Sequence, residues 1–410
     1  MYHPNKYRLY PFPNQERELL RQFDELRFLW NYALEQRQDA WRKEKRSISY
    51  VDQCRGLAKW RAYDQEGVGR VYGHVAQETL ARLDDAFKHF FRRVRAGGQP
   101  GFPRFKREIT SMCYPDSNGS GALVPGRNGT WRFRLSTVGE LPIKVHRLPP
   151  EGRVKTVTVK REGDRWYAVL TYEIADPAPA PATSAEAPVG VDLGLTHLAT
   201  LSTGEVVEAP KFLHRAEVLL KRRQRKLSRK RKGSHNWHKQ RVRVARCHAK
   251  VRDQRRDLAH KTTTGWAKRH DLIAFENLCV SNMLGHGHLS RSISDAGWGM
   301  LRQMSQYKEV RRSGRYIEVP AGGTTQTCSK CGKVADPPLT LRDRTYSCPC
   351  GLRIDRDLNA ARNVLARALA AVPGGTGEST PVETGPPPHR KGRRVRSLKQ
   401  EPPLASAVAR

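Results

Sequence analysis

Four of the eight cysteines in this 410-residue chain crowd into twenty-three positions near its C-terminal end, as two short pairs separated by sixteen residues. Two such pairs can supply four thiolates to one tetrahedral zinc ion, which would be structural because no position stays open for water. Two disulfides or free thiols are the alternatives. Gly351 is expected to permit the tight turn of the shorter second pair. The predicted zinc ligands are Cys328, Cys331, Cys348 and Cys350.

Three acidic residues stand at the ends of different predicted elements. Asp192 and Glu276 each end an apolar segment, and Asp357 lies where a C-terminal helix is expected to begin. Carboxylates that follow buried strands can converge, and their hard oxygens suit two Mg²⁺ ions about 4 Å apart, an arrangement that serves phosphodiester hydrolysis. Taken alone, each acid is more often a cap or a surface group. Asp355 is a rival to Asp357, or the cap of the helix.

The formal net charge of +35 points to a polyanionic partner, nucleic acid above all, although some of the excess can be plain solvated surface. Residues 211–256 hold 19 Lys and Arg against two acids, and are expected to form two helices broken near 233–236. Charges at that density repel one another unless phosphates lie against them; two solvated helix faces are the alternative. The predicted nucleic-acid contacts are Lys221, Arg222, Arg223, Arg225, Lys226, Arg229, Lys230, Arg231 and Lys232.

Hydrophobic periodicity organises the rest of the chain. Helical spacing predicts helices at about 15–43 and 72–94, and alternation between about 130 and 174 predicts an antiparallel sheet or small barrel. The run rich in Pro and Ala at 176–188 is expected to be an extended tether, after which strands alternating with helices predict an α/β sheet. No stretch approaches the roughly 18 apolar residues of a membrane span, and residues 1–30 lack the apolar core of a secretion signal, so a cytoplasmic protein is expected.

With these features the chain resembles the TnpB family of transposon-encoded, RNA-guided DNA endonucleases, OrfB-type proteins related to type V CRISPR effectors. The resemblance covers almost the whole sequence and rests on short motifs spread along it. The motifs are Arg8-Leu-Tyr-Pro11, Arg27-Phe-Leu-Trp-Asn31, Gly101-Phe-Pro-Arg-Phe105, Gly190-Val-Asp-Leu-Gly194, Phe275-Glu-Asn-Leu278, Ser292-Ile-Ser-Asp-Ala-Gly-Trp298, Thr325-Gln-Thr-Cys328 and Asp355-Arg-Asp-Leu-Asn-Ala-Ala361, together with the cysteine pairs.

The resemblance implies that Asp192, Glu276 and Asp357 are the catalytic triad of a metal-dependent nuclease that cuts double-stranded DNA beside a short transposon-associated motif. A guide (omega) RNA copied from the transposon end would direct the cut, with a protein monomer in the ribonucleoprotein. Gln77 is expected to face the flanking motif. The alternatives are a guided repressor that does not cut and a transposase-type protein; the presence of all three acids favours cutting.

The resemblance also implies a multidomain α+β fold. A RuvC-like (RNase H-like) α/β nuclease domain with an inserted zinc ribbon follows an antiparallel wedge β-barrel, which a helical recognition domain interrupts. The expected parts are the first barrel strand at 1–11, the helical recognition domain at 12–120, the barrel at 121–175, the linker at 176–188, the nuclease domain at 189–323 with a basic hairpin at about 210–270, the zinc ribbon at 324–353, the C-terminal nuclease segment at 354–372, and a disordered basic tail at 373–410.

Overall fold

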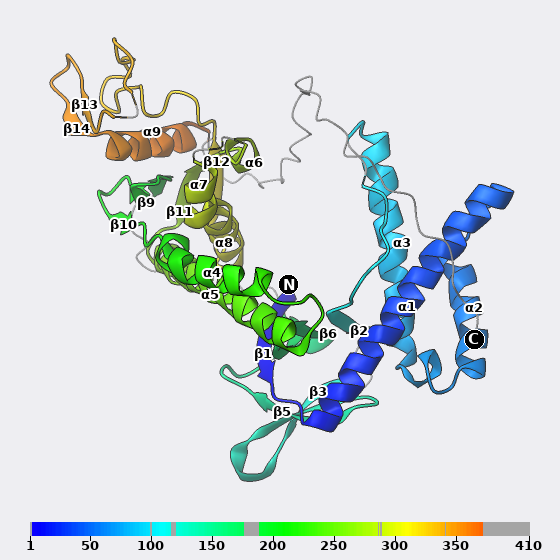
Figure 1. Cartoon of the computed structure of the whole chain (residues 1–410). Helices are drawn as coiled ribbons and strands as arrows, with labels where there is room; N and C mark the ends of the chain where they lie inside the picture. Colours follow the sequence, from blue (N-terminus) through cyan, green and yellow to red (C-terminus); the bar gives the residue numbers. More distant parts are fainter. Residues whose placement is uncertain are drawn as a thin grey trace.

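The computed structural model describes residues 2–98, 101–115, 120–175, 188–285, 287, 289–340 and 342–371. The expected tether, apart from Pro188, and the expected C-terminal tail lie outside these ranges. Figure 1 shows a seven-stranded sheet with three helices on one side of it and a second, five-stranded sheet with its own helices on the other. The mixed α+β architecture expected from the sequence is therefore present. No helix in the described ranges is long and apolar enough to cross a membrane.

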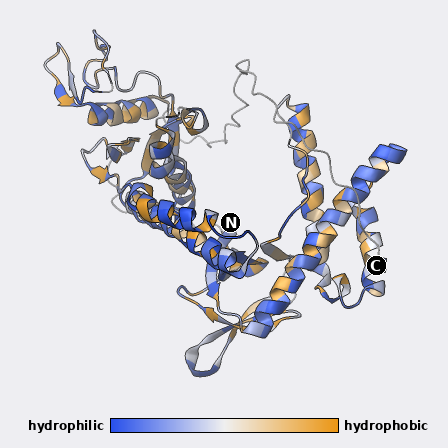
Figure 2. Cartoon of the chain, in the orientation of Figure 1, coloured by the Kyte–Doolittle hydropathy of each residue, from blue (hydrophilic) through white to orange (hydrophobic). Residues whose placement is uncertain are grey.

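The three N-terminal helices are α1 (Pro13–Glu44), α2 (Tyr50–Tyr63) and α3 (Gly73–Arg95). Two of them match the helices predicted from apolar spacing. Spacing alone does not reveal α2, because Gln53 and Leu57 are its only buried residues. The apolar stripe of α1 consists of Leu19, Phe23, Leu26, Leu29, Trp30, Ala33 and Leu34, and the orange bands along α1 in Figure 2 follow it.

The larger sheet is antiparallel throughout, and its first strand comes from the very start of the chain. Its order is β2-β6-β7-β1-β5-β4-β3, so β1 pairs with β7 on one side and with β5 on the other. At Gly121 an added Cβ would lie 3.0 Å from Cγ1 of Val157, so β3 curls over β6. The strands are β1 (Tyr2–Leu9), β2 (Ser111–Pro115), β3 (Gly121–Pro125), β4 (Trp131–Leu135), β5 (Gly139–Lys144), β6 (Arg153–Glu162) and β7 (Arg165–Glu173).

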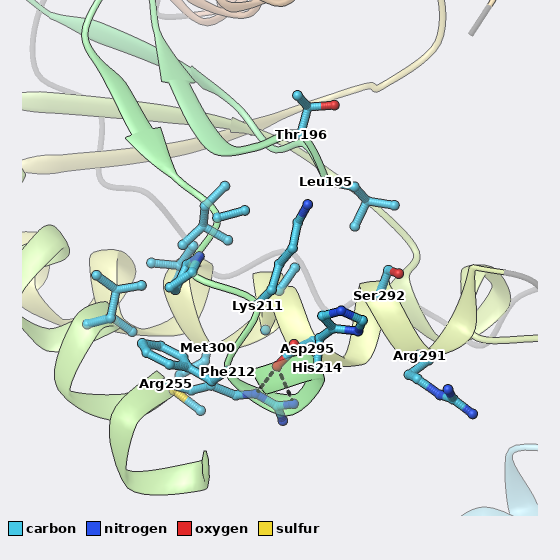
Figure 3. Close-up of a pocket in the computed structure, with 18 residues that line it drawn as sticks. Leu195, Thr196, Lys211, Phe212, His214, Arg255, Arg291, Ser292, Asp295 and Met300 are labelled. Carbon is cyan, nitrogen blue, oxygen red and sulfur yellow. Dashed lines mark hydrogen bonds and ion pairs between the residues drawn. The ribbon is translucent and has the colours of Figure 1, made fainter. Parts of the chain in front are cut away.

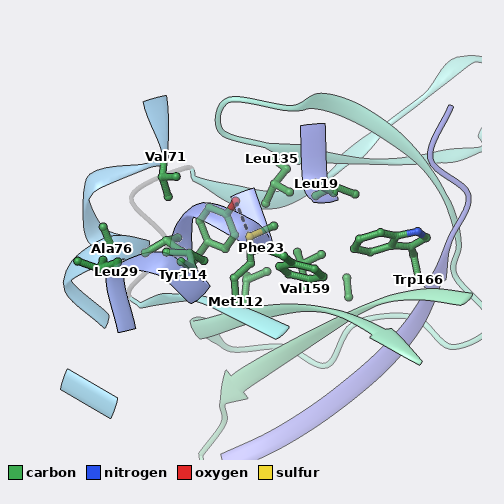
Figure 4. Close-up of a cluster of buried hydrophobic side chains, with 14 of the residues drawn as sticks. Leu19, Phe23, Leu29, Val71, Ala76, Met112, Tyr114, Leu135, Val159 and Trp166 are labelled. Atoms are coloured by element: carbon green, nitrogen blue, oxygen red, sulfur yellow. Dashed lines mark hydrogen bonds between the residues drawn. The ribbon is translucent and has the colours of Figure 1, made fainter. Parts of the chain in front are cut away.

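One limit expected from the sequence needs correction. The helical region is expected over 12–120, but β2 lies inside that range and pairs with β6 along its whole length. The helices and the sheet also share one core: Phe23 of α1 stacks on Trp166 of β7 with ring centroids 5.4 Å apart, and Figure 4 shows Met112 and Tyr114 of β2 in the same cluster. The helical region therefore rests directly on the sheet.

The smaller sheet has the mixed order β10-β9-β8-β11-β12. Strand β8 lies at its centre, antiparallel to β9 and parallel to β11, which in turn is parallel to β12. Helices cover both faces, which explains why β8 and β11 are apolar at almost every position. The strands are β8 (Val189–Asp192), β9 (His197–Leu201), β10 (Val206–Glu208), β11 (Leu272–Glu276) and β12 (Arg315–Val319).

The covering helices alternate with these strands in the chain. One face packs on α5 and α8, and the other packs on the C-terminal helix α9. Helices α4 and α5 form the predicted basic hairpin, coloured mostly as hydrophilic in Figure 2. The helices are α4 (Phe212–Ser228), α5 (His235–Arg269), α6 (Val280–Met283), α7 (Ser290–Ala296), α8 (Trp298–Arg311) and α9 (Arg356–Ala371), with the two-stranded ribbon β13 (Thr345–Ser347) and β14 (Arg353–Asp355) before α9.

Ion pairs join the basic hairpin to the larger sheet. Arg252 of α5 lies 3.0 Å from Glu162 at the end of β6, and Glu162 also binds Lys6 of β1 at 2.8 Å. Arg246, nearly two turns earlier on α5, pairs with Asp164 in the β6–β7 turn. The hairpin is therefore fixed against the sheet at one edge and not held only by its own sequence connections.

Candidate active site and metal centres

The three predicted acids end on one face of the smaller sheet. Asp192 is the last residue of β8 and Glu276 the last residue of β11, and the parallel register places Phe275 opposite Val191. Val191 and Phe275 face the α5 and α8 side, so the next residue of each strand faces α9. Side chains alternate between the two faces along each strand, and the register pairs Val191 with Phe275. Both carboxylates therefore point to the same face of the sheet.

Helix α9 brings the third acid to that face. At Gly190 of β8 an added Cβ would stand 2.2 Å from the carbonyl oxygen of Ala361, so the helix backbone touches the strand at a point where only glycine fits. Asp357 lies in the first turn of α9 and is buried there, at 8 % exposure. The strand glycine thus sets how closely α9, and Asp357 with it, approaches the ends of β8 and β11.

Asp355 and Asp357 have different partners in the structure. Oδ1 of Asp355 accepts hydrogen bonds from the backbone N–H groups of Asp357 and Leu358, at 2.9 and 3.0 Å, which is the geometry of a helix N-cap. Asp355 is therefore occupied as the cap, the role that the sequence left open for it. The carboxylate of Asp357 instead accepts from Arg356 at 3.2 Å and lies 3.9 Å from Arg344.

Burial and neighbouring charges shift the pKa values of Asp192 and Glu276. Asp192 and Glu276 are each 7 % exposed. Burial of Asp192, and after it the carboxylates of Glu276 and Asp357, raises the pKa of Asp192 well above its ordinary value. Burial also raises the pKa of Glu276, against the hydrogen bond from Thr324 and the charge of Arg367. A cation bound beside Asp192 would offset both the burial of its carboxylate and the repulsion from its acidic neighbours.

Thr324 is a residue of this site that sequence patterns do not identify. Its hydroxyl donates to Oε1 of Glu276, and the residue is buried at the start of the segment that leads to the first cysteine pair. The motif quoted from the sequence begins at the adjacent Thr325 and leaves Thr324 out. Only the fold shows that the chain returns from β12 past the end of β11 at this residue.

The four predicted zinc ligands come together. Their sulfur atoms all lie within 4.8 Å of one another, which no other group of three or more potential ligands does in the part of the chain that the structure describes. The Cys328–Cys350 and Cys331–Cys348 sulfurs are 3.7 and 3.5 Å apart. Zn–S bonds of about 2.3 Å in a tetrahedron require S···S separations of about 3.8 Å, whereas a disulfide requires about 2.0 Å. The cysteines therefore fit one zinc ion and are not disulfides.

Both cysteine pairs are followed by glycines with left-handed backbones. Gly332 has φ +77° and Gly351 has φ +84°, and each donates its N–H to the carbonyl of the first cysteine of its pair. The turn expected at Gly351 is thus present. Burial would raise the pKa of the Cys328 thiol, but N–H groups of Cys331 and Lys330 outweigh it and lower the pKa to about 7. A thiolate is the form that binds metal.

The predicted nucleic-acid contacts divide into two groups. Lys221 pairs with Glu217 at 2.9 Å, and Arg223 turns toward α5, where it donates to the carbonyl of Arg243. Gln77 is exposed on α3. The other predicted contacts are exposed, and their side chains have no acidic partner among the residues that the structure describes; they are Arg222, Arg225, Lys226, Arg229, Lys230, Arg231 and Lys232.

A cavity of about 460 Å³ lies between the hairpin, α7, α8 and the loop after β8. Figure 3 shows Lys211 extending across it toward Leu195 and Thr196. At its floor Asp295 accepts hydrogen bonds from Arg255 and from the backbone N–H of Leu213 in the first turn of α4. The acid is therefore fully used in anchoring the hairpin.

Family models and curated relatives match most of the chain. Family models described as "Probable transposase", "Cas12f1-like, TNB domain" and "Helix-turn-helix domain" match residues 169–286, 298–364 and 1–46. The last range forms β1 and α1 here. The chain is 38 % identical to a putative RNA-guided DNA endonuclease of Streptomyces pristinaespiralis, over 98 % of this chain and 96 % of that protein.

Two further matches extend the comparison. The chain is 31 % identical to the putative RNA-guided DNA endonuclease InsQ of Escherichia coli K12, over 97 % of this chain and 96 % of that protein. Its fold is similar to that of the protein in a Cas12f1–sgRNA–target DNA complex, with a TM-score of 0.54 at 12 % identity, covering 86 % of this chain and 83 % of that one.

Proposed function

This chain belongs to the TnpB family. We propose that it is an RNA-guided endonuclease that cleaves double-stranded DNA, with Asp192, Glu276 and Asp357 as its catalytic acids. The observation that carries the proposal is the convergence of these three buried acids on one face of the smaller sheet. The mixed strand order of that sheet and the helix that delivers Asp357 are consistent with a RuvC-like nuclease domain.

The three carboxylates would hold divalent cations, with Mg²⁺ as the natural choice for hard oxygen ligands. Two bound Mg²⁺ ions would stabilise the attacking and leaving oxygens of a phosphodiester during hydrolysis. Thr324 holds the Glu276 carboxyl in place, and the Arg356 guanidinium holds that of Asp357. Each of these contacts restricts the rotation of one carboxylate side chain.

The guide RNA and the DNA target would lie against the basic hairpin. The cations of α4 and of the turn after it that lack an acidic partner among the described residues form a basic surface. Such a surface would bind nucleic acid whatever its base sequence, because Lys and Arg would contact the phosphates here and not the bases. Base pairing with the guide would then supply sequence selection, while exposed Gln77 on α3 would read the flanking motif. In this proposal the RNA derives from the transposon end that follows the gene.

The decisive experiment compares two aspartates two positions apart. The protein is purified with RNA copied from its own gene end, then given Mg²⁺ and plasmids in which a guide-matched site adjoins randomised bases. Asp357→Asn should abolish cleavage, because it removes a ligand charge. Asp355→Asn should keep cleavage within about threefold, because asparagine also caps helices well.

The outcomes separate the candidate functions. Loss of cleavage in Asp355→Asn but not in Asp357→Asn would overturn the assignment of the third acid. If the unaltered protein binds guide-matched DNA tightly but cuts no member of the plasmid library at any Mg²⁺ concentration, it is a guided repressor and not a nuclease.

A further inference from the structure

One face of α9 carries a row of polar side chains that hold the segment between β12 and the first cysteine pair. We call Asn359, Asn363 and Arg367 the α9 ladder; they are four residues apart, so they lie one above another on the helix. Arg367 donates to the carbonyls of Pro320 and Gly322, at 2.7 and 2.8 Å. Figure 1 shows α9 lying beside the chain that leaves the end of β12.

The two asparagines continue the row toward the cysteines. Asn363 Nδ2 donates to the carbonyls of Thr324 and Thr327, at 2.8 and 2.6 Å. Asn359 Nδ2 donates to the same Thr327 carbonyl at 2.7 Å, and its Oδ1 accepts from the N–H of Ser329 at 2.9 Å. Thr327 and Ser329 flank Cys328, so Asn359 forms hydrogen bonds with the backbone on both sides of a predicted zinc ligand.

The same row is connected to the acid cluster indirectly, through Thr324 and through the backbone of α9. Asn363 binds the carbonyl of Thr324, whose hydroxyl holds Glu276. Asn359 lies two residues after Asp357 on the first turns of α9. Both asparagines are buried, at 0 and 7 % exposure, so water cannot replace their bonds without rearrangement. A shift of the cysteine segment must therefore move α9 or Thr324, and with them two of the three acids.

We propose that Asn359 and Asn363 are positioning residues that couple the cysteine site to the acid site, so that zinc in one and Mg²⁺ in the other stabilise the same placement of α9. The acid-site half of this coupling rests on the proposed function, whereas the zinc half does not. Coupling of this kind is reciprocal: if zinc improves Mg²⁺ binding, Mg²⁺ must improve zinc binding by the same factor.

The test measures zinc release from the full chain to a chromophoric chelator that ignores Mg²⁺, with and without Mg²⁺. Mg²⁺ should slow zinc loss from the unaltered protein. Asn363→Ala should lose zinc about tenfold faster, the scale of effects seen when partners of metal ligands are removed, and Mg²⁺ should no longer protect it. Asp357→Asn should release zinc near the normal rate but without Mg²⁺ protection, because its ladder is intact and its acid site is not.

The matched control is Asn31→Ala. Asn31 also exchanges two hydrogen bonds with a backbone, donating to the Lys106 carbonyl at 3.0 Å and accepting from its N–H at 2.8 Å, but it lies on α1. This variant should keep both the zinc release rate and its Mg²⁺ protection. If Asn363→Ala does not fold, Arg367→Gln serves instead, because it changes only the partly exposed end of the α9 ladder. In this variant Mg²⁺ should slow zinc release less than in the unaltered protein.

Two results would overturn the coupling: unchanged Mg²⁺ protection in Asn363→Ala, or equal acceleration of zinc loss in Asn31→Ala. Absence of DNA cleavage would not bear on it, because zinc release is measured without nucleic acid. Failure of the nuclease proposal and failure of the coupling are thus read from different measurements.

Discussion

Single carboxylates in this molecule differ in role because of their immediate partners. Asp355 accepts hydrogen bonds from two backbone donors at the start of α9, while burial and three other acids, Glu276, Asp357 and Asp355, raise the pKa of Asp192. The first arrangement stabilises the fold. The second opposes it, since an acid whose pKa is raised holds its proton more tightly in the folded chain than in the unfolded one. The folded state therefore loses stability as pH rises above 3.8, the ordinary pKa of aspartate, through the raised value.

Replacing Asp192 by asparagine should remove this destabilisation of the folded state. Without divalent cations at neutral pH, Asp192→Asn should melt at a higher temperature than the unaltered protein, and the gap should shrink as pH falls toward 3.8, because the raised pKa of Asp192 favours its protonated form in the folded chain. Each kcal/mol recovered corresponds to about 2–4 °C in a domain of 150–250 residues. Mg²⁺ should reverse the order by stabilising only the unaltered protein. Thermal scans across pH measure this, and a variant that is less stable than the original without Mg²⁺ at pH 7 contradicts it.

At the scale of elements, the sequence predicts what local patterns encode. Apolar runs identified β8 and β11 and helical spacing identified α1 and α3, because burial imposes those periods. Short β2 and mostly exposed α2 carry little pattern, so tertiary pairing alone reveals them. The acids and cysteines could be chosen from residue type and spacing. Thr324, Asn359 and Asn363 could not, since their partners are backbone carbonyls that sequence does not place; only the four-residue spacing to Arg367 hints at a common helix face.

The contact between α9 and β8 gives a sharp prediction. Gly190→Ala places a methyl group 2.2 Å from the Ala361 carbonyl and 2.6 Å from the Leu365 nitrogen, both backbone atoms that cannot turn aside. The helix must lift, so we expect a loss of about 3 kcal/mol or more in unfolding free energy and loss of Mg²⁺ stabilisation.

Gly265→Ala is the control for this change. Gly265 lies inside α5 with nothing within 4 Å of an added Cβ, so alanine should stabilise by about 0.5–1 kcal/mol. Urea unfolding of the two variants measures the contrast. Equal stabilities would mean that α9 does not rest on β8 at Gly190.

Across the whole molecule, the basic residues differ in whether an acidic side chain lies beside them. The net charge of +35 is most concentrated in the basic hairpin, where some cations have acidic partners: Lys221 binds Glu217 of the hairpin itself, and Arg252 and Arg246 bind Glu162 and Asp164 at the β6–β7 end of the larger sheet. Lys221, Arg246 and Arg252 are thus neutralised within the protein, whereas the exposed cations from Arg222 to Lys232 named above have no acidic partner among the described residues. The family resemblance drawn from the sequence is confirmed by full-length relatives, and this division of charges adds which cations are available to a polyanion.

That division predicts a difference in salt dependence. Removing one cation that binds a phosphate should reduce the steepness of log binding constant against log salt by about 0.7 for single-stranded and 0.9 for duplex nucleic acid. Replacing Arg225, Lys226 and Lys230 together by glutamine should therefore reduce the slope for the gene-end RNA by about 2. Lys221→Gln should change it by much less than one unit, because Glu217 already neutralises Lys221. Filter binding over a salt series measures both slopes, and an unchanged slope in the triple variant would place the RNA on another surface.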